Sequence, residues 1–143
     1  MIRTVLVASD GSEVAQAAVC TAIELTQSFG PDARLHVVAV VSYLDVPGML
    51  AKHPAGAPDL LGEQATTALD DASALAAASG VAYETHRLEG DAVESILACA
   101  EETGAQILVI GAHGRSRLVR LVLGSIAERL VRSTQLPVVV VRR

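Results

Sequence analysis

The 143-residue chain has a formal net charge of −5, and 51% of its residues are hydrophobic while only 2% are aromatic. This length suits one domain with a single buried core, so we expect one domain over residues 1–143. The first apolar run is too short for a signal peptide, and no later run approaches the roughly 20 residues that cross a bilayer. We therefore expect a cytoplasmic protein with no membrane partner, and the acidic balance argues against nucleic-acid binding.

Strand-like and helix-like segments alternate along the whole chain. Short β-branched apolar runs predict strands, whereas apolar residues at three- and four-residue spacing, followed by glycine, predict helices. In chain order we predict strand 4–9, helix 12–29, strand 34–41, helix 60–79, strand 81–88, helix 92–103, strand 106–110, helix 125–133 and strand 137–142. Residues 43–58 hold three prolines and two glycines, which predicts a long surface loop that could act as a lid.

This alternation predicts an α/β fold made of βαβ units with one parallel sheet. We expect a single open, doubly wound, Rossmann-like sheet of five strands in the order 3-2-1-4-5. The first two helices then cover one face and the last two cover the other. Cys20 and Cys99 are interpreted as small core residues on opposite faces, too far apart to form a disulfide.

A ligand site is expected where the strand order reverses, outside the carboxyl ends of the first and fourth strands. Residues 8–12 end the first strand there. After the fourth strand come Gly111, Gly114 and Gly124, separated by two and then nine residues, with Ser125 opening a helix. Glycines allow backbone N–H groups to approach an anion, and a helix N-terminus favours negative charge. Ser125 could both cap this helix and donate its hydroxyl to a phosphate.

Two interpretations of these glycines stay open. Each glycine taken alone could merely form a turn. Their joint position beside Arg115 and Arg117 favours an anion site, so we include both arginines in it. Arg120, Arg129 and Arg132 are predicted to be solvated charges on helix faces.

Asp10 also has two interpretations. It could form an Asx-turn with the residues that follow, or it could accept a ribose hydroxyl and help to hold Mg²⁺. His113, between two loop glycines, is predicted to contact a ligand rather than to catalyse. His36, His53 and His86 show no metal-ligand spacing in the sequence, and we assign them no chemistry.

The glycine spacing, followed directly by serine, resembles the ATP-binding signature of the universal stress protein family. The likeness extends over VLVASDGS near the start, LHVV in the second strand, GAHGRSRLVRLVLGS and the closing IAERLVRSTQLPVVVVR. It implies that the chain binds ATP as a cofactor, with Mg²⁺ as a candidate companion. The residues implied to contact the nucleotide are Ala8, Ser9, Asp10, Val37, Ile110, Gly111, His113, Gly114, Gly124, Ser125 and Ile126.

Other nucleotide-binding classes lack their signatures here. There is no G-x-x-x-x-G-K-[ST] motif, the only lysine is Lys52, and no H-x-G-H element is present. We therefore expect no catalytic residues and at most slow ATP hydrolysis, in a nucleotide-dependent regulator of the stress response. The alternatives are a dimeric interaction module that binds no nucleotide, and a slow ATPase or phosphotransferase.

Two kinds of partner are expected. Bound ATP is predicted to order residues 115–123 and 43–58, and so to change a surface read by an unidentified protein partner. The fifth strand, with four consecutive valines from Val138 to Val141, is expected at a sheet edge. The family resemblance implies a homodimer formed through this strand.

Overall fold

The computed structural model describes residues 1–42, 59–114 and 123–143 of the chain. The elements are β1 (Thr4–Ala8), α1 (Glu13–Ser28), β2 (Arg34–Val41), α2 (Leu60–Ser79), β3 (Ala82–Glu89), α3 (Ala92–Thr103), β4 (Ile107–Gly111), α4 (Ser125–Ser133) and β5 (Val138–Val141). All nine predicted elements are confirmed, and their ends differ from the prediction by at most one residue. The expected loop at residues 43–58 lies outside the described residues. No helix in the described ranges is both long and apolar enough to span a membrane.

The five strands form one sheet in the order β3-β2-β1-β4-β5, and every neighbouring pair is parallel. The predicted topology is therefore confirmed. Val7 of β1 stands opposite Val37 of β2 on one side and opposite Val109 of β4 on the other. This register brings the carboxyl ends of β1 and β4 together where the strand order reverses, so the two chain segments that follow them leave the sheet side by side.

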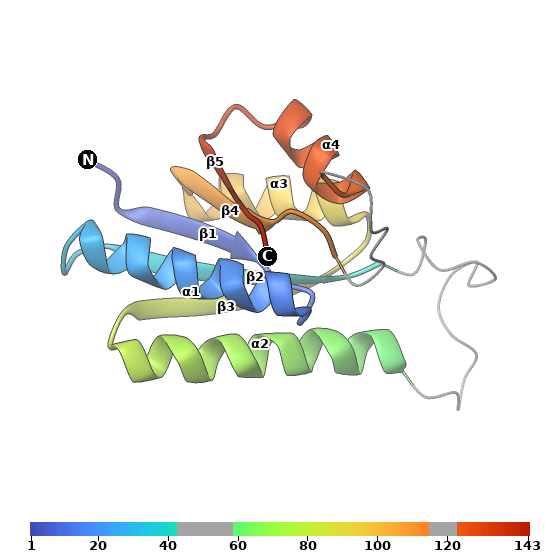
Figure 1. The fold of residues 1–143 in the computed structure, drawn as a ribbon, viewed down its shortest axis with the longest axis horizontal. Helices are drawn as coiled ribbons and strands as arrows, with labels where there is room; N and C mark the ends of the chain where they lie inside the picture. The colour runs from blue at the N-terminus through green and yellow to red at the C-terminus, as the bar shows by residue number, and fades with distance from the viewer. Residues whose placement is uncertain (43–58, 115–122) are drawn as a thin grey trace.

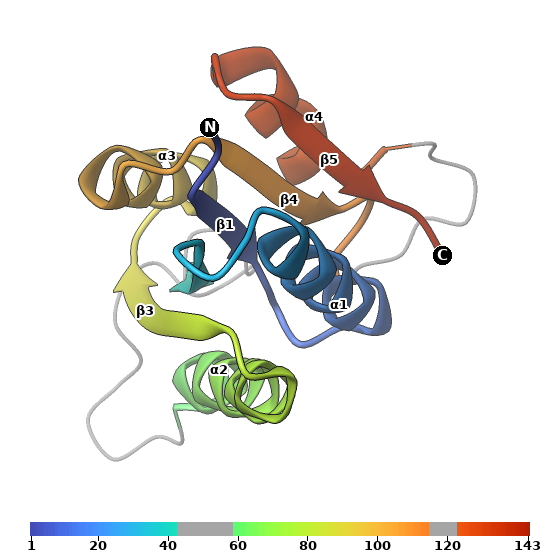
Figure 2. The ribbon, with the colours of Figure 1, turned by 90° about the vertical axis from the view of Figure 1, so that its left-hand side faces the viewer.

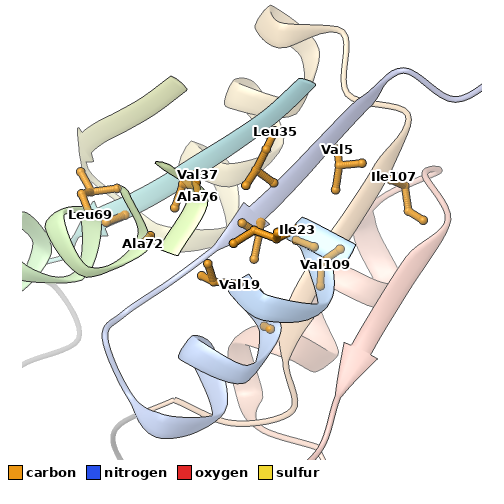
Figure 3. Packing of buried hydrophobic residues seen from close by; sticks show 14 of the residues in the cluster. Val5, Val19, Ile23, Leu35, Val37, Leu69, Ala72, Ala76, Ile107 and Val109 are labelled. Atoms are coloured by element: carbon orange, nitrogen blue, oxygen red, sulfur yellow. The ribbon is translucent and has the colours of Figure 1, made fainter. Parts of the chain in front are cut away.

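Helices cover both faces of the sheet, as predicted: α1 and α2 lie on one side, and α3 and α4 lie on the other (Figure 1). The face under α1 and α2 buries Val37 against a cluster that includes Val19 and Ile23 (Figure 3). The opposite face buries Val38 and Leu108 beneath α3 and α4. Adjacent strand residues thus serve different cores, because side chains alternate between the faces of a sheet.

The helix starts differ in one respect that matters for the site. Ser12, Asp59 and Asp91 cap α1, α2 and α3, and each side chain accepts a hydrogen bond from a backbone N–H three residues on. The cap residue of α4 is Gly124, which has no side chain to make such a bond. The predicted capping role of Ser125 is therefore wrong, because Ser125 is the first residue inside the helix.

The two cysteines lie on helices of opposite faces, but only one belongs to a core. Cys99 is buried on α3, and burial, with a smaller contribution from Glu102, raises the pKa of its thiol to about 11. Cys20 is exposed on α1. The prediction for Cys20 is therefore wrong: the helix buries neighbours such as Val19 and Ala22, and Cys20 lies outside that buried stripe.

Candidate functional site

A cavity of about 350 Å³ opens at the carboxyl ends of β1 and β4, at the predicted position. Its walls come from β1, β2 and β4, from the segments that follow β1 and β4, and from α1, α3 and α4. Ten of the predicted site residues line it: Ala8, Ser9, Asp10, Ile110, Gly111, His113, Gly114, Gly124, Ser125 and Ile126. Residues more than 100 positions apart in sequence therefore share one cavity, as the strand order requires.

One predicted site residue among those that the structure describes, Val37, does not line the cavity. The side chain of Val37 is fully buried in the core under α1 and α2, on the face of the sheet away from the cavity. Its neighbours Val38 and Val40 line the cavity instead, because strand side chains alternate. Arg115 and Arg117 lie outside the described residues.

One part of the cavity wall is apolar, and the sequence analysis missed most of it. Val38, Val40, Ile96 and Leu130 join Ile110 there, from four different elements. The full set of lining residues that were not predicted is Ala15, Val38, Val40, Ser42, Ala92, Ile96, Ala127 and Leu130. Strand alternation predicts that Val38 and Val40 share one face of the sheet but not that this face lines the cavity, and the helical residues follow only from tertiary packing. An apolar wall with a few polar groups is typical of small-molecule sites.

The polar part of the cavity is built around the N-terminus of α4. The N–H of Gly124 donates to the carbonyl of Ala112 at 2.6 Å, which fixes this helix start against the end of β4. The N–H groups of Ser125, Ile126 and Ala127 have no acceptor within the helix, because the first turn of an α-helix cannot supply one. Among the described residues, no side chain caps this turn. The helix dipole adds partial positive charge, so the arrangement suits an anion.

The three signature glycines are needed for close approach rather than for unusual backbone angles, since none of them has a positive φ. A Cβ on Gly111 would lie 3.1 Å from a methyl group of Val14, and one on Gly124 would lie 3.1 Å from the carbonyl oxygen of Ala112. At Gly114 the nearest atom would be Oδ2 of Asp10, at 2.8 Å. The lack of a side chain at Gly111 and Gly124 therefore allows neighbouring segments of the chain to pack closely. At Gly114 it leaves room beside the carboxylate of Asp10.

Asp10 and His113 add ionisable groups to the polar part. Oδ1 of Asp10 accepts a hydrogen bond from the N–H of Ser12 at 2.9 Å, so the expected Asx-turn is present. Its other oxygen, Oδ2, faces Gly114. Nδ1 of His113 is buried and has no hydrogen-bond partner among the described residues. A buried polar atom without a partner is costly unless a ligand or water completes it.

An ion pair joins α4, which carries the anion-binding turn, to α3. Nη2 of Arg129 lies 3.3 Å from Oδ2 of Asp91, and Arg129 is exposed on the helix face, as predicted. The backbone N–H of Glu94 first, and Arg129 second, hold the pKa of Asp91 below its ordinary value. Arg132 pairs with Glu128 along α4, 2.8 Å apart, and is exposed as expected. Arg120 lies outside the described residues.

A second group of ionisable side chains lies away from this cavity, on β2 and β3. Nδ1 of His36 lies 2.9 Å from Nε2 of His86 and 3.6 Å from a carboxylate oxygen of Glu84. Burial first, and then the neighbouring His86, lowers the pKa of His36. The interpretation that these histidines have no shared chemistry considered only their spacing in the chain, and the strand register brings together residues that are 50 positions apart.

An open, doubly wound parallel sheet with a cavity at its reversal point places the chain among the Rossmann-like α/β proteins. The model of the universal stress protein family matches residues 1–142, and the chain belongs to this family.

Curated and solved relatives agree with this assignment. The universal stress protein MJ0531 of Methanocaldococcus jannaschii is 31% identical over all of this chain and 84% of its own length. A solved family member from Burkholderia pseudomallei is 34% identical, with a TM-score of 0.75 over 98% of this chain and 96% of its own. A universal stress protein solved in complex with cAMP is 25% identical, with a TM-score of 0.72 over 98% of this chain and 97% of its own.

Proposed function

We propose that this protein binds an adenine nucleotide, ATP foremost, and acts as a nucleotide-dependent regulator in the stress response. The observation that carries the proposal is the uncapped N-terminus of α4, which opens into a cavity with an apolar wall. A base and a polyphosphate need these two environments side by side. The structure of a family member with cAMP supports the same ligand class.

Each part of the ligand has a matching part of the cavity. The adenine ring packs against the apolar wall that includes Val38 and Ile110, and the ribose lies near the end of β1 at Ser9. The phosphates accept hydrogen bonds from the N–H groups of Ser125 and Ile126 and from the Ser125 hydroxyl. His113 then gains the hydrogen-bond partner that its buried Nδ1 lacks within the described residues.

Asp10 brings a carboxylate into the polar part of the cavity, and carboxylate oxygens are ligands that Mg²⁺ prefers. We infer that Mg²⁺ accompanies the nucleotide and that Asp10 helps to hold it, directly or through water. Asparagine forms the same Asx-turn without the charge. Asp10→Asn should therefore weaken ATP binding about three- to tenfold with Mg²⁺, and strengthen it without Mg²⁺. Equal affinities for both proteins under both conditions would assign Asp10 to the turn alone.

The free edge of β5 supports the proposed homodimer. The N–H of Leu108 donates to the carbonyl of Pro137, and the N–H of Ala112 donates to that of Val141. In a parallel ladder alternate residues face the same neighbour, so the backbone groups of Val138 and Val140 point to the free edge. A second copy related by a two-fold axis can pair with these groups and cover the apolar edge.

Two measurements test the proposed ligand. Freshly purified protein is denatured and any released nucleotide is identified by chromatography, and the stripped protein is then titrated with ATP, AMP and cAMP. We expect adenine nucleotide in the extract or a dissociation constant below millimolar for the stripped protein. Absence of both contradicts the proposal and favours an interaction module. Phosphate release from bound ATP should be slow, because the polar groups bind phosphate but include no lysine.

A further inference from the structure

The group on β2 and β3 consists of two imidazoles and one carboxylate on a single face of the sheet. His36 stands directly opposite Glu84 in the parallel register, and His86 stands opposite Val38. Because side chains alternate, His36, Glu84 and His86 all point to the face that carries Val38. β3 is the edge strand, as Figure 2 shows. The group therefore lies near the β3 edge of the sheet and not among its central strands.

The donor atoms of these side chains converge on one point. One nitrogen of each histidine and one oxygen of Glu84 lie within 4.8 Å of one another. The two ring nitrogens are 2.9 Å apart, so the lone pair of one is directed at the N–H of the other and the pair shares one proton. Glu84 is 57% exposed at its side chain, and it can rotate toward the rings at little cost.

We propose that Nδ1 of His36, Nε2 of His86 and a carboxylate oxygen of Glu84 bind a divalent transition-metal ion of the zinc type. Two histidines and one glutamate form a ligand set that zinc uses with water in the fourth position. Bonds of about 2.0–2.1 Å in a tetrahedral site place donor atoms roughly 3.4 Å apart. The two ring nitrogens need to separate by about 0.5 Å from their present 2.9 Å contact, and each ring must turn so that its lone pair points at the metal, which replaces the shared proton.

The surroundings of the group are compatible with a cation and leave room for water. It borders an open hollow of about 600 Å³ that is also lined by Arg3, Arg34, Asp32 and Glu102. Together with Glu84 these side chains carry three negative and two positive charges, so one negative charge remains for a cation to neutralise. Imidazole donors select transition metals, whereas Mg²⁺ prefers oxygen ligands. The site is thus chemically distinct from the proposed nucleotide cavity and does not depend on it.

The test measures metal binding to the full-length, untagged protein without nucleotide. A Cys20→Ser background removes the exposed thiol, which could otherwise bind zinc. Isothermal titration with Zn²⁺ should give one ion per chain, and Co²⁺ should produce the visible absorption of a four-coordinate site. Glu84→Gln and His86→Gln should each weaken Zn²⁺ binding at least tenfold. Circular dichroism confirms that each variant is folded.

Glu102→Gln is the matched control, because it removes one negative charge from the same hollow but lies outside the ligand group. Coordination predicts that this variant binds Zn²⁺ as the parent does. Equal losses for Glu84→Gln and Glu102→Gln would overturn the proposal, since they would indicate general electrostatic attraction. Absence of Zn²⁺ binding, binding that survives His86→Gln, or equal affinity for Mg²⁺ would overturn it as well.

Discussion

Alanine substitutions at Gly111 and Gly114 should separate the packing role of the signature glycines from their ligand role. A methyl group on Gly111 would lie 3.1 Å and 3.3 Å from the two γ-methyl groups of Val14, closer than the roughly 3.5–4.0 Å of an ordinary carbon contact. Val14 is buried on α1 and has little freedom to move. Overpacking of this kind costs about 1–3 kcal/mol, so Gly111→Ala should lower the melting temperature by roughly 3–10 °C.

The methyl group of Gly114→Ala meets a different neighbour. It would lie 2.8 Å from Oδ2 of Asp10, the end of an exposed side chain that can rotate away. The structural cost then includes the hydrogen bond to the Ser12 N–H, about 1 kcal/mol. The methyl group and the displaced carboxylate both intrude on the proposed phosphate position, so ATP affinity should fall at least tenfold.

Urea denaturation and calorimetric titration with ATP check both variants. The expected pattern is that Gly111→Ala loses the greater share of unfolding free energy, while Gly114→Ala loses affinity and stays close to the parent in stability. A Gly111→Ala variant as stable as the parent would refute the close approach to Val14. Unchanged ATP affinity in Gly114→Ala would refute the position assigned to the phosphates.

Three further predictions concern other parts of the molecule. A thiol reagent should modify one cysteine per native chain, the exposed Cys20, while Cys99 reacts only after unfolding; two fast-reacting thiols would contradict the burial of Cys99. Because the pKa of Asp91 is lowered in the folded state, its charge stabilises the fold above the ordinary carboxyl pKa, and this contribution disappears as the pH falls through the lowered value. Asp91→Asn, which keeps a capping side chain, should therefore be less stable than the parent at pH 7 and equal to it near pH 2; an unchanged difference would contradict the shift. Val140→Pro removes an outward N–H and should convert the proposed dimer to a folded monomer in light scattering, whereas an intact dimer would exclude pairing through β5.

The sequence predicted the features that depend on local periodicity and on topology rules. Apolar spacing and glycine stops located the helices and strands, the βαβ alternation predicted a parallel sheet, and the expectation of an open doubly wound fold supplied the strand order. The point where the strand order reverses then predicted the position of the cavity, and no particular side chain was needed for that prediction. Ten of the predicted residues line it because they end β1 or β4, follow these strands directly, or lie at the start of α4, which are positions that the chain order alone defines.

The predictions that failed depended on the exact position of a single residue. Val37 and Val38 are equally apolar, so the sequence does not indicate which of them faces the cavity. Gly124 and Ser125 are adjacent candidates for a cap, and the helix begins at Ser125, one residue earlier than a serine cap requires. Cys20 lies next to the buried stripe of α1. A small residue at such a position can be buried or exposed, and the sequence does not indicate which.

The histidine group was missed for a different reason. His36 and His86 are 50 positions apart, and only the register between β2 and β3 brings them to 2.9 Å. Metal-ligand spacing in a sequence reports ligands that share a helix or a turn, and it does not report ligands on neighbouring strands. Once the parallel register between two strands is known, the side chains that it brings together can be predicted.

A map of backbone amide shifts on addition of ATP and Mg²⁺ to the stripped protein tests the central claim most directly. We expect the largest changes at residues 8–10, at Gly114 and at residues 125–127, which line the cavity around the start of α4. Changes confined to other surfaces, or no change at millimolar ATP, would contradict the claim that this cavity binds the nucleotide.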